Sequence, residues 1–577
     1  MRTVLPMVRV GATAALLALV PSCASRSAAA PGERSGPLRY DLRLDVAPAE
    51  ELVHVTAELE GLTGPLTLDF AEQYAFARLE PRLVGDARAT APDGRPLACT
   101  RPDPYELWVD PDGATEATLT WSVRVDHRRT QEVETAFDHY EHPYLAADHG
   151  MLLTAAIFPV PRHPDINATV RIVVPEGWQV TAPWPQVEPE VEPPVWRPDP
   201  RGLRNDIVAL GQWTRVEGSA GGLDYAILLA PGQERLAEVV ADRLPPVVEA
   251  EVELFGGAPQ PKYMFVFGRP DTPQGYGGSP KGNSMALFVS PDLPDDFVRE
   301  GVTHLVAHEY HHTWMKARCE PLDELRFVIE GFTDYYAYLV PWRLGMTSDE
   351  RLATTFGGKL AEAEVSLSRF GKDLARAGGP DFFAGRDAYT ACYSGGLGLA
   401  LWTDLALRDV GSDLDRFLRA FYGDEEWSAS RRPSLADWEA LLRQELGDEL
   451  AEAQLDAVSA ADGIDWVGLF GLLDVEVERG EAPFERTPRA NFDGTTVTFL
   501  DGGGAGAAIG LQPGDRLLEV NGRDVADEAS IRAAWAAPED GRIVVTLERG
   551  NERLVVDVPE PTATTYRVPT GVVDLLR

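Results

Sequence analysis

Residues 302–336 constrain this chain most, because they carry the sequence HEYHH among apolar residues at helical spacing. No Pro or Gly interrupts residues 302–318, so we expect a helix there. Positions four apart face the same way on a helix, which puts His308 and His312 one turn apart on one face. Two neutral imidazoles in this arrangement can bind one Zn²⁺, and Glu309 between them can reach a water on the metal.

The third ligand of such a site has one leading candidate. A catalytic zinc usually takes three protein ligands and keeps one position for water. Glu330 begins a second helix-like run, EGFTDYY, and seventeen residues separate it from His312. Glu320 and Glu324 lie in the same span and remain alternatives, although neither begins such a run. Asp334, one turn after Glu330, is placed to accept an N–H from a ligating histidine.

Together these motifs resemble the gluzincin clan of zinc metallopeptidases. Residues 330–336 are similar to the EGFTxYY motif of the glycyl aminopeptidase family, and residues 312–318 resemble its HxWNxKR motif, with Met315 and Ala317 replacing the Asn and the Lys. The loop before Glu330 is shorter than in that family and closer to gluzincin aminopeptidases generally. The resemblance implies a zinc-dependent peptidase with a thermolysin-like α+β catalytic domain.

That resemblance also implies roles for individual residues. His308, His312 and Glu330 would bind Zn²⁺, and Glu309 would be the general base. Residues 389–408 look like the family's YYxKGxLVxLLLDLxIR, although Gly replaces the Lys. This places Tyr393 on the tyrosine that donates a hydrogen bond to the oxyanion in related aminopeptidases. The function that follows is hydrolysis of peptide bonds by a metal-activated water.

A glycine-rich segment, residues 276–290, resembles the family's GGLEHxxS and makes Gly277 and Gly278 candidate substrate contacts. Pro280 and Lys281 stand where the Glu and the His would be. An aminopeptidase must hold a protonated α-amine, which calls for a carboxylate in a dry site. Either another acid takes this role or recognition of the N-terminus is relaxed. The choice between an aminopeptidase and an endopeptidase therefore stays open, with a modest preference for the second.

Towards the C-terminus, residues 486–559 resemble a PDZ domain of the bacterial protease type. Residues 506–522 are close to AGLxxGDxIxxVNG. We expect the groove helix at residues 530–536, a strand at residues 542–548 and the carboxylate-binding loop near residues 490–494. PDZ domains bind an extended peptide as an added strand, so a peptide ligand is implied.

The N-terminus is typical of an export signal. Two arginines precede an apolar run of ten residues, which is too short to span a membrane as a helix. Cys23 ends a sequence resembling a bacterial lipobox, which predicts a signal peptide over residues 1–22 and a lipidated tether over residues 23–36. The expected location is the outer membrane of the bacterial cell envelope, facing the periplasm, with contact through the lipid anchor only. An ordinary secreted protein is the alternative.

The remaining chain divides by pattern into three expected domains. Residues 37–222 alternate polar and apolar residues and predict an antiparallel β-sandwich. Residues 223–478 form the expected catalytic domain, residues 479–562 the PDZ domain and residues 563–577 a C-terminal tail. Truncation after the catalytic domain is expected to leave hydrolysis of short peptides intact. A net charge of −38 excludes nucleic acid as a natural partner.

Two other readings of function remain open. The chain could be a non-catalytic, PDZ-bearing lipoprotein that binds peptides around a structural metal, although structural zinc has no use for Glu309. It could also be a hydrolase of non-peptide substrates. Three cysteines remain after Cys23, and Cys319 and Cys392 could either pair or stay as buried thiols.

Overall fold

The computed structural model describes the chain from residue 37 onward, with gaps. The described residues are 37–70, 81–125, 143–163, 165–268, 276–289, 293, 295–319, 323–384, 386–423, 434–461, 463–483, 488, 490–500, 505–536, 542–550, 552–559 and 562–577. Cys23 and Glu320 lie outside these residues, and so does the side chain of Cys319. None of the helices within these ranges has the length and apolar composition needed to cross a bilayer.

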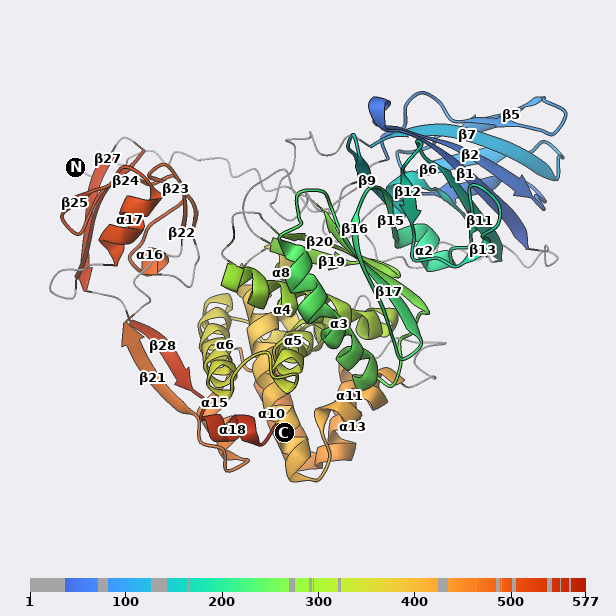
Figure 1. Cartoon of the computed structure of the whole chain (residues 1–577). Coiled ribbons are helices and arrows are strands. Elements are labelled where there is room, and N and C mark those ends of the chain that lie inside the picture. The colour runs from blue at the N-terminus through green and yellow to red at the C-terminus, as the bar shows by residue number, and fades with distance from the viewer. Residues whose placement is uncertain are drawn as a thin grey trace, which may run out of the picture.

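The first part of the described chain is rich in strands, as the alternating pattern predicts (Figure 1). Its long strands β1 (Leu38–Ala47), β2 (Leu52–Glu60) and β7 (Glu116–Arg124) are antiparallel neighbours, but β1 also pairs in parallel with β11 (Ile166–Val173). The sheet is therefore not wholly antiparallel. Its full order is β10 (Val160–Pro161), β3 (Leu66–Asp69), β6 (Glu106–Asp110), β5 (Pro96–Thr100), β4 (Arg88–Thr90), β7, β2, β1, β11, β14 (Val195–Trp196) and β13 (Gln186–Glu188).

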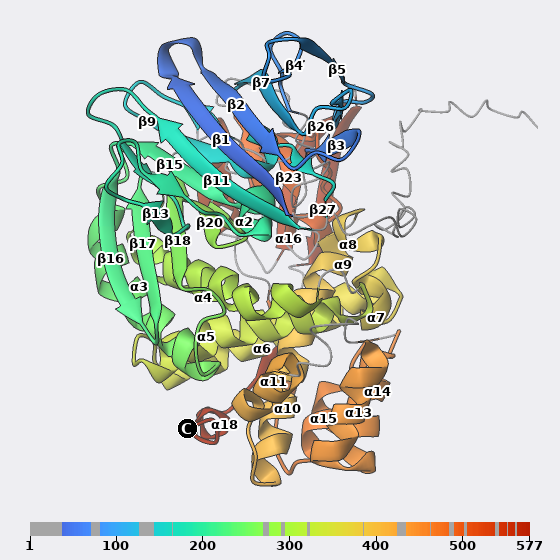
Figure 2. The same cartoon turned by 90° about the vertical axis from the view of Figure 1, so that its right-hand side faces the viewer.

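A second sheet joins this region to the catalytic one. It contains β12 (Gln179–Thr181), β15 (Ile207–Gly211), β9 (His149–Leu153) and β8 (Tyr144–Leu145). Met151 and Ile207 of this sheet share a buried cluster with Met264, Val266 and Ala286 of the catalytic sheet. The two sheets thus pack face to face, as the β9 and β15 ribbons in Figure 2 suggest.

The catalytic region begins with a five-stranded sheet. Its order is β16 (Thr214–Ala220), β17 (Leu223–Leu229), β18 (Lys262–Gly268), β20 (Ser284–Val289) and β19 (Tyr276–Pro280), with β17, β18 and β20 parallel. The boundary expected after residue 222 therefore falls inside the β16–β17 hairpin. On the face opposite the second sheet, α3 (Leu236–Leu254) and α4 (Asp295–Cys319) bury apolar residues of both helices against the strands.

Helices complete the catalytic region around α10 (Gly396–Asp409), whose residues 396–407 are all buried. Such a helix is apolar on every side because neighbours cover all of its faces. They include α5 (Thr333–Arg343), α6 (Asp349–Phe370), α11 (Leu414–Gly423), α13 (Leu435–Leu446), α14 (Asp448–Val458) and α15 (Trp466–Gly471). Three short helices, α7 (Leu374–Ala377), α8 (Asp381–Ala384) and α9 (Arg386–Thr390), connect α6 to this core.

A separate β unit near the C-terminus has its own buried core. Its strands are β22 (Ala490–Asp493), β23 (Thr496–Leu500), β24 (Arg516–Val520), β26 (Arg542–Arg549) and β27 (Glu552–Pro559), with α17 (Glu528–Trp535) beside them. The expected groove helix and strand are thus present at α17 and β26. The expected carboxylate-binding loop near residues 490–494 is wrong in its placement, because most of that segment forms the edge strand β22.

The β unit is an insertion, and the chain returns from it to the catalytic region. Strand β21 (Glu478–Pro483) leads out and pairs with β28 (Thr562–Arg567), which leads back; we call this pair the stalk (Figure 1). The last helix, α18 (Thr570–Asp574), then packs on α6, with Val572 and Val573 buried in the helical core. Residues 563–577 are therefore part of the catalytic core, and the expected C-terminal tail is wrong.

Candidate active site

The α4 helix and the segment that follows it bring three ligand atoms together. His308 and His312 lie one turn apart on α4, with their Nε2 atoms 3.2 Å from each other. Glu330 Oε2 lies 3.6 Å from His308 Nε2 and 3.5 Å from His312 Nε2. These residues form the one group in the described chain whose His, Cys, Asp or Glu atoms could hold a metal together.

This triangle has the dimensions of a zinc site. Zn–N and Zn–O bonds of about 2.0–2.1 Å in tetrahedral geometry place neighbouring ligand atoms about 3.4 Å apart. The three observed separations lie within a few tenths of an ångström of that value. Two imidazoles and one carboxylate also match the donor set of a catalytic zinc that keeps one position for water. The residues present therefore fit the ion.

The rival carboxylates do not compete for this position. Glu324 Oε1 accepts a hydrogen bond from the Leu435 backbone N–H at 3.2 Å, and its side chain is exposed. Glu320 lies outside the described residues. Among the three candidates, Glu330 is the one that the described structure places against both histidines.

The carboxylates and imidazoles of the site stabilise each other's charged forms. Burial alone would raise the pKa of Glu330, but His312 and His308 beside it hold that pKa well below its ordinary value. Burial alone would lower the pKa of His308, but Asp334 and Glu330 raise it to about 10. The protein thus supplies an ionised carboxylate here, and a proton occupies His308 when no cation does.

Asp334 lies behind His308, the ligand that the sequence leads us to expect as its hydrogen-bond donor. Its Oδ1 lies 3.5 Å from His308 Nδ1 and accepts a hydrogen bond of 2.9 Å from His304 Nε2. Lys359 of α6 places its Nζ 3.5 Å from Asp334 Oδ2. Burial alone would raise the pKa of Asp334, but Lys359 and His304 keep it well below its ordinary value. This carboxylate is therefore ionised and can orient the His308 ring.

Strand β19 forms the edge of the sheet beside Glu309. A Cβ added to Gly278 would lie 3.1 Å from Glu309 Cγ, so the backbone of this strand runs directly along the catalytic face of α4. A Cβ added to Gly277 would instead meet Phe288 at 2.6 Å on the opposite face. Strand β19 is thus placed so that a substrate backbone could align along it.

Alternation along β19 also resolves where Pro280 and Lys281 point. Pro280 shares the face of Gly278, towards α4. Lys281 follows on the opposite side, where its Nζ donates to Ser279 Oγ at 2.8 Å and its side chain is buried. The lysine therefore does not face the metal ligands, and the carboxylate of the glycyl aminopeptidase pattern is replaced on the catalytic face by the proline ring.

Tyr393 lies against the metal ligands as expected. Its ring is stacked on that of His308, with centroids 5.5 Å apart and planes 14° apart. Burial raises the pKa of Tyr393 well above its ordinary value, and the negative charge of Glu330 adds to this. The hydroxyl is therefore protonated and can act as a hydrogen-bond donor. Cys392, the residue before it, is a buried free thiol.

Two π-helical segments carry Glu330 and Tyr393. They are η5 (Phe327–Phe332) and η6 (Ala391–Gly395), and a Cβ on Gly331 of η5 would come too close to the backbone of Gly396, the first residue of α10 after η6. Because π-helical turns are rare and cluster at functional sites, both segments mark a position where ordinary helical geometry would misplace a side chain. The glycine contact lets the third ligand and the tyrosine approach the same point.

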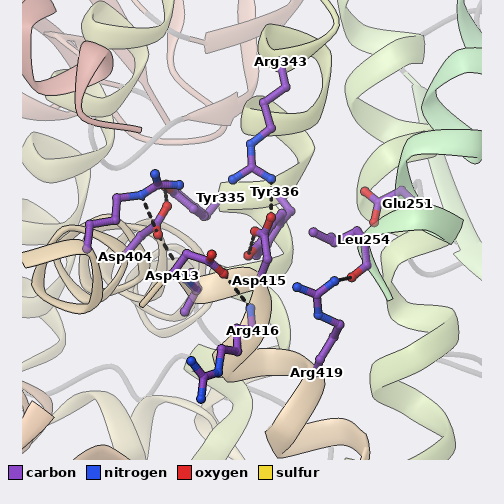
Figure 3. A network of polar contacts seen from close by, with 12 residues as sticks. Glu251, Leu254, Tyr335, Tyr336, Arg343, Asp404, Asp413, Asp415, Arg416 and Arg419 are labelled. Atoms are coloured by element: carbon purple, nitrogen blue, oxygen red, sulfur yellow. Dashed lines mark hydrogen bonds and ion pairs between the residues drawn. The ribbon is translucent and has the colours of Figure 1, made fainter. Parts of the chain in front are cut away.

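The two tyrosines that end EGFTDYY fix α5 to the helices behind it (Figure 3). Tyr335 donates to Asp404 of α10 at 2.8 Å, and Tyr336 donates to Asp415 of α11 at 2.7 Å. Arg343, on the last turn of α5, pairs with Asp415 at 2.7 Å. The motif thus contributes one ligand and two anchors that hold the helix next to it.

Several residues around the site were not predicted from the sequence. His304 and Lys359 contact Asp334 from positions 30 residues before it and 25 residues after it. His311 lies between His308 and His312 in the sequence, but its side chain faces away from the ligand triangle. Its Nδ1 is hydrogen-bonded to Glu251 Oε2 of α3 at 2.9 Å. The one signal available was spacing, since His304 lies four residues before His308 on the same helical face.

Comparison with protein families gives a match over the residues that form the metal site. Residues 301–380, which contain all three ligands and Asp334, match the M61 glycyl aminopeptidase family, and residues 497–549 match a PDZ domain. The chain is a zinc metallopeptidase, and its residues 301–380 carry the match to the M61 glycyl aminopeptidase family. It carries a PDZ domain as the insertion described above. No curated protein matches this metallopeptidase significantly.

One solved structure shares the fold of the metallopeptidase along nearly its whole length. An aminopeptidase N family protein from Idiomarina loihiensis is 18% identical, covers 94% of this chain and 100% of its own, and has a TM-score of 0.72. This likeness shows a common fold along nearly the whole chain. A mutant M1 zinc metallopeptidase from Deinococcus radiodurans, bound to a Tyr-Ser-Ala substrate, is 16% identical with a TM-score of 0.48, covering 74% of this chain and 95% of its own.

Proposed function

We propose that this metallopeptidase hydrolyses peptide bonds with Glu309 as general base and His308, His312 and Glu330 as zinc ligands. The observation that carries the proposal is the ligand triangle, whose separations of 3.2, 3.5 and 3.6 Å suit tetrahedral zinc. Zinc in such a site lowers the pKa of a bound water to about 7 and polarises the scissile carbonyl. For the fold, we propose an N-terminal β-sandwich followed by a thermolysin-like catalytic domain.

Each residue then has a defined task. Glu309 takes the proton of the attacking water and returns it to the leaving amine. Tyr393, whose ring stacks on that of His308, donates a hydrogen bond to the developing oxyanion. Asp334 holds His308 in one orientation and tautomer. Gly277 and Gly278 present backbone groups of the edge strand to the substrate chain.

The test is a comparison of Glu309→Gln with the wild type. The variant should keep one zinc per chain and lose turnover of a peptide library by at least a thousandfold, because it removes the base and leaves every ligand. Glu330→Ala should lose zinc itself. A Glu309→Gln protein that still cleaves peptides at the wild-type rate would refute the assignment, and a metal-replete but inactive wild type would favour the non-catalytic alternative.

We further propose relaxed recognition of the substrate's N-terminus. Pro280 occupies the catalytic face of β19, where a carboxylate would be needed to hold an α-amine. N-acetylation of a good peptide substrate should therefore lower kcat/KM by less than tenfold. Pro280→Glu should make the enzyme favour the free amine. A loss of a hundredfold or more on acetylation, about 3 kcal/mol, would instead reveal an unseen acid in the wild type.

The location of the protein is also a proposal. Cys23 and the apolar run before it suggest a lipoprotein of the outer membrane, acting on exported or periplasmic peptides. Cys23→Ala should move the protein from the membrane fraction to the soluble fraction. A wild type that is soluble after lysis would favour the secreted alternative.

A further inference from the structure

Three aromatic rings pack against one another next to the metal ligands. The ring of Tyr393 stacks on His308, and Tyr389 stacks on Tyr393 with centroids 4.4 Å and planes 26° apart. Phe382 contacts both tyrosines, with its centroid 5.1 Å from that of Tyr389 and 6.4 Å from that of Tyr393. Tyr389 and Tyr393 are four residues apart, so they share one face of the α9–η6 segment. We call Tyr389, Tyr393 and Phe382 the aromatic row.

Within the aromatic row, Tyr389 is the member that faces solvent. It is 37% exposed, whereas Phe382 is 2% exposed. Among the large hydrophobic side chains that stand exposed in the described part of the chain, Tyr389 is the one aromatic residue. An exposed aromatic face next to a metal site is a surface on which a ligand can bury apolar area.

The aromatic row is held rigid from behind. The Arg326 guanidinium lies 4.6 Å from the centroid of the Phe382 ring, and its Nε donates to the Gly378 carbonyl at 2.8 Å. Tyr389 thus packs against Tyr393 and against a Phe382 ring that Arg326 holds in place. A preformed aromatic surface loses little conformational entropy when a ligand binds to it.

The charges around Tyr389 define which ligands suit it. Burial raises the pKa of the Tyr389 hydroxyl, and the negative charges of Glu330, Glu309 and Asp334 contribute. The side chain is therefore neutral. An apolar or aromatic side chain suits its exposed face.

We infer that Tyr389 is a specificity-determining residue, forming a subsite for a large apolar or aromatic side chain next to the scissile peptide bond. The subsite lies one ring beyond Tyr393, so the side chain that it receives belongs to a residue flanking the cleaved bond. This inference rests on the proposed peptidase function, and it names the substrate class: peptides that carry Phe, Tyr, Trp or Leu at the cleavage site.

The first measurement is the ratio of kcat/KM for a peptide with Phe at the cleavage site to that for its Gly twin. Wild type should favour Phe by at least tenfold. Tyr389→Ser should lower this ratio at least fivefold, whereas Tyr389→Phe should preserve it. Leu472→Ala, which alters an exposed apolar residue elsewhere in the catalytic region, should leave the ratio unchanged. A general folding defect would lower both rates and not their ratio.

The second measurement separates the subsite from the hydrolytic function. Calorimetry would compare binding of 3-phenylpropanohydroxamate and acetohydroxamate to the zinc-loaded protein and both Tyr389 variants. The phenyl compound should bind wild type at least tenfold more tightly, and Tyr389→Ser should remove most of this preference. If this preference holds but no peptide is cleaved, the proposed function fails and the subsite stands. If peptides are cleaved but Tyr389→Ser changes neither ratio, the inference is overturned.

Discussion

The protonation state of His308 depends on whether a cation is bound at the site. In the metal-free protein, burial opposes its charge, yet Asp334 and Glu330 raise its pKa to about 10. A metal ligand must be a neutral imidazole, so zinc has to displace that proton. The same two carboxylates that orient the ligand therefore make its zinc affinity depend on pH.

We expect zinc to release about one proton per ion between pH 6 and pH 9, below the raised pKa of His308. The apparent zinc affinity should then rise about tenfold for each pH unit in this window, because the competing proton becomes scarcer. Calorimetric titration in buffers of different ionisation enthalpy measures the released proton directly. A zinc affinity that is independent of pH would show that the metal-free His308 is neutral.

Gly331 must be a glycine because the backbone of Gly396 lies too close for a side chain. A Cβ at this position would lie too close to the Gly396 backbone, and backbone atoms cannot move aside cheaply. We expect Gly331→Ala to destabilise the protein by about 2–3 kcal/mol and to lower its zinc content, because the neighbouring Glu330 must shift. Thermal unfolding and metal analysis check this.

The matched control is Gly358→Ala on α6. Nothing lies within 4 Å of an added Cβ there, and the residue is exposed. Replacement of a helical glycine by alanine should stabilise the protein by up to about 1 kcal/mol without changing zinc content. Equal effects of the two substitutions would mean that the contact between Gly331 and Gly396 is not tight.

At the scale of elements, hydrogen bonds from two tyrosines connect α5 to α10 and α11. Tyr336→Phe removes the hydrogen bond to Asp415, while Arg343 continues to neutralise that carboxylate. We expect a loss of about 1–2 kcal/mol of stability and a modest fall in kcat with zinc still bound. Chemical denaturation and steady-state kinetics would detect these changes. Unchanged stability would show that water replaces the hydroxyl.

The sequence predicts those residues of the site that lie close to one another along the chain. His308, Glu309 and His312 follow from the repeat of one helix, and Glu330 and Asp334 from a motif one loop away. Lys359 was not predictable, because its contact with Asp334 depends on how α6 packs across α5. The fold shows the same limit, since alternation predicts the strands but not the parallel pairing of β1 with β11.

For the whole molecule, the stalk changes what truncation means. Val572, Val573 and Leu576 after β28 are buried in the catalytic core, and Arg577 pairs with Asp349 at the start of α6. Each buried apolar side chain contributes about 1.5–3 kcal/mol. We therefore no longer expect that all residues after the catalytic domain can be removed. Deleting the whole C-terminal part and removing the PDZ domain alone should have different effects.

Deletion of residues 484–577 should destabilise the catalytic region and lower its zinc content, because β21 loses its partner and α6 loses α18. Replacement of residues 484–561 by Asn-Gly should instead close β21 and β28 into a hairpin. This second protein should keep its melting temperature and its hydrolysis of short peptides within twofold, and lose activity only on substrates delivered by the PDZ groove. The reverse pattern would show that α18 contributes nothing.

The return of the chain from the PDZ domain also sets the order in which the enzyme can be completed during synthesis. A ribosome makes β21, then the whole PDZ domain, and only afterwards β28 and α18. The helical core that holds Lys359 and Glu330 therefore lacks these packing partners until residues 562–577 have emerged. A nascent or prematurely terminated chain is an incomplete peptidase, so full activity arises only in molecules that already possess their peptide-binding domain.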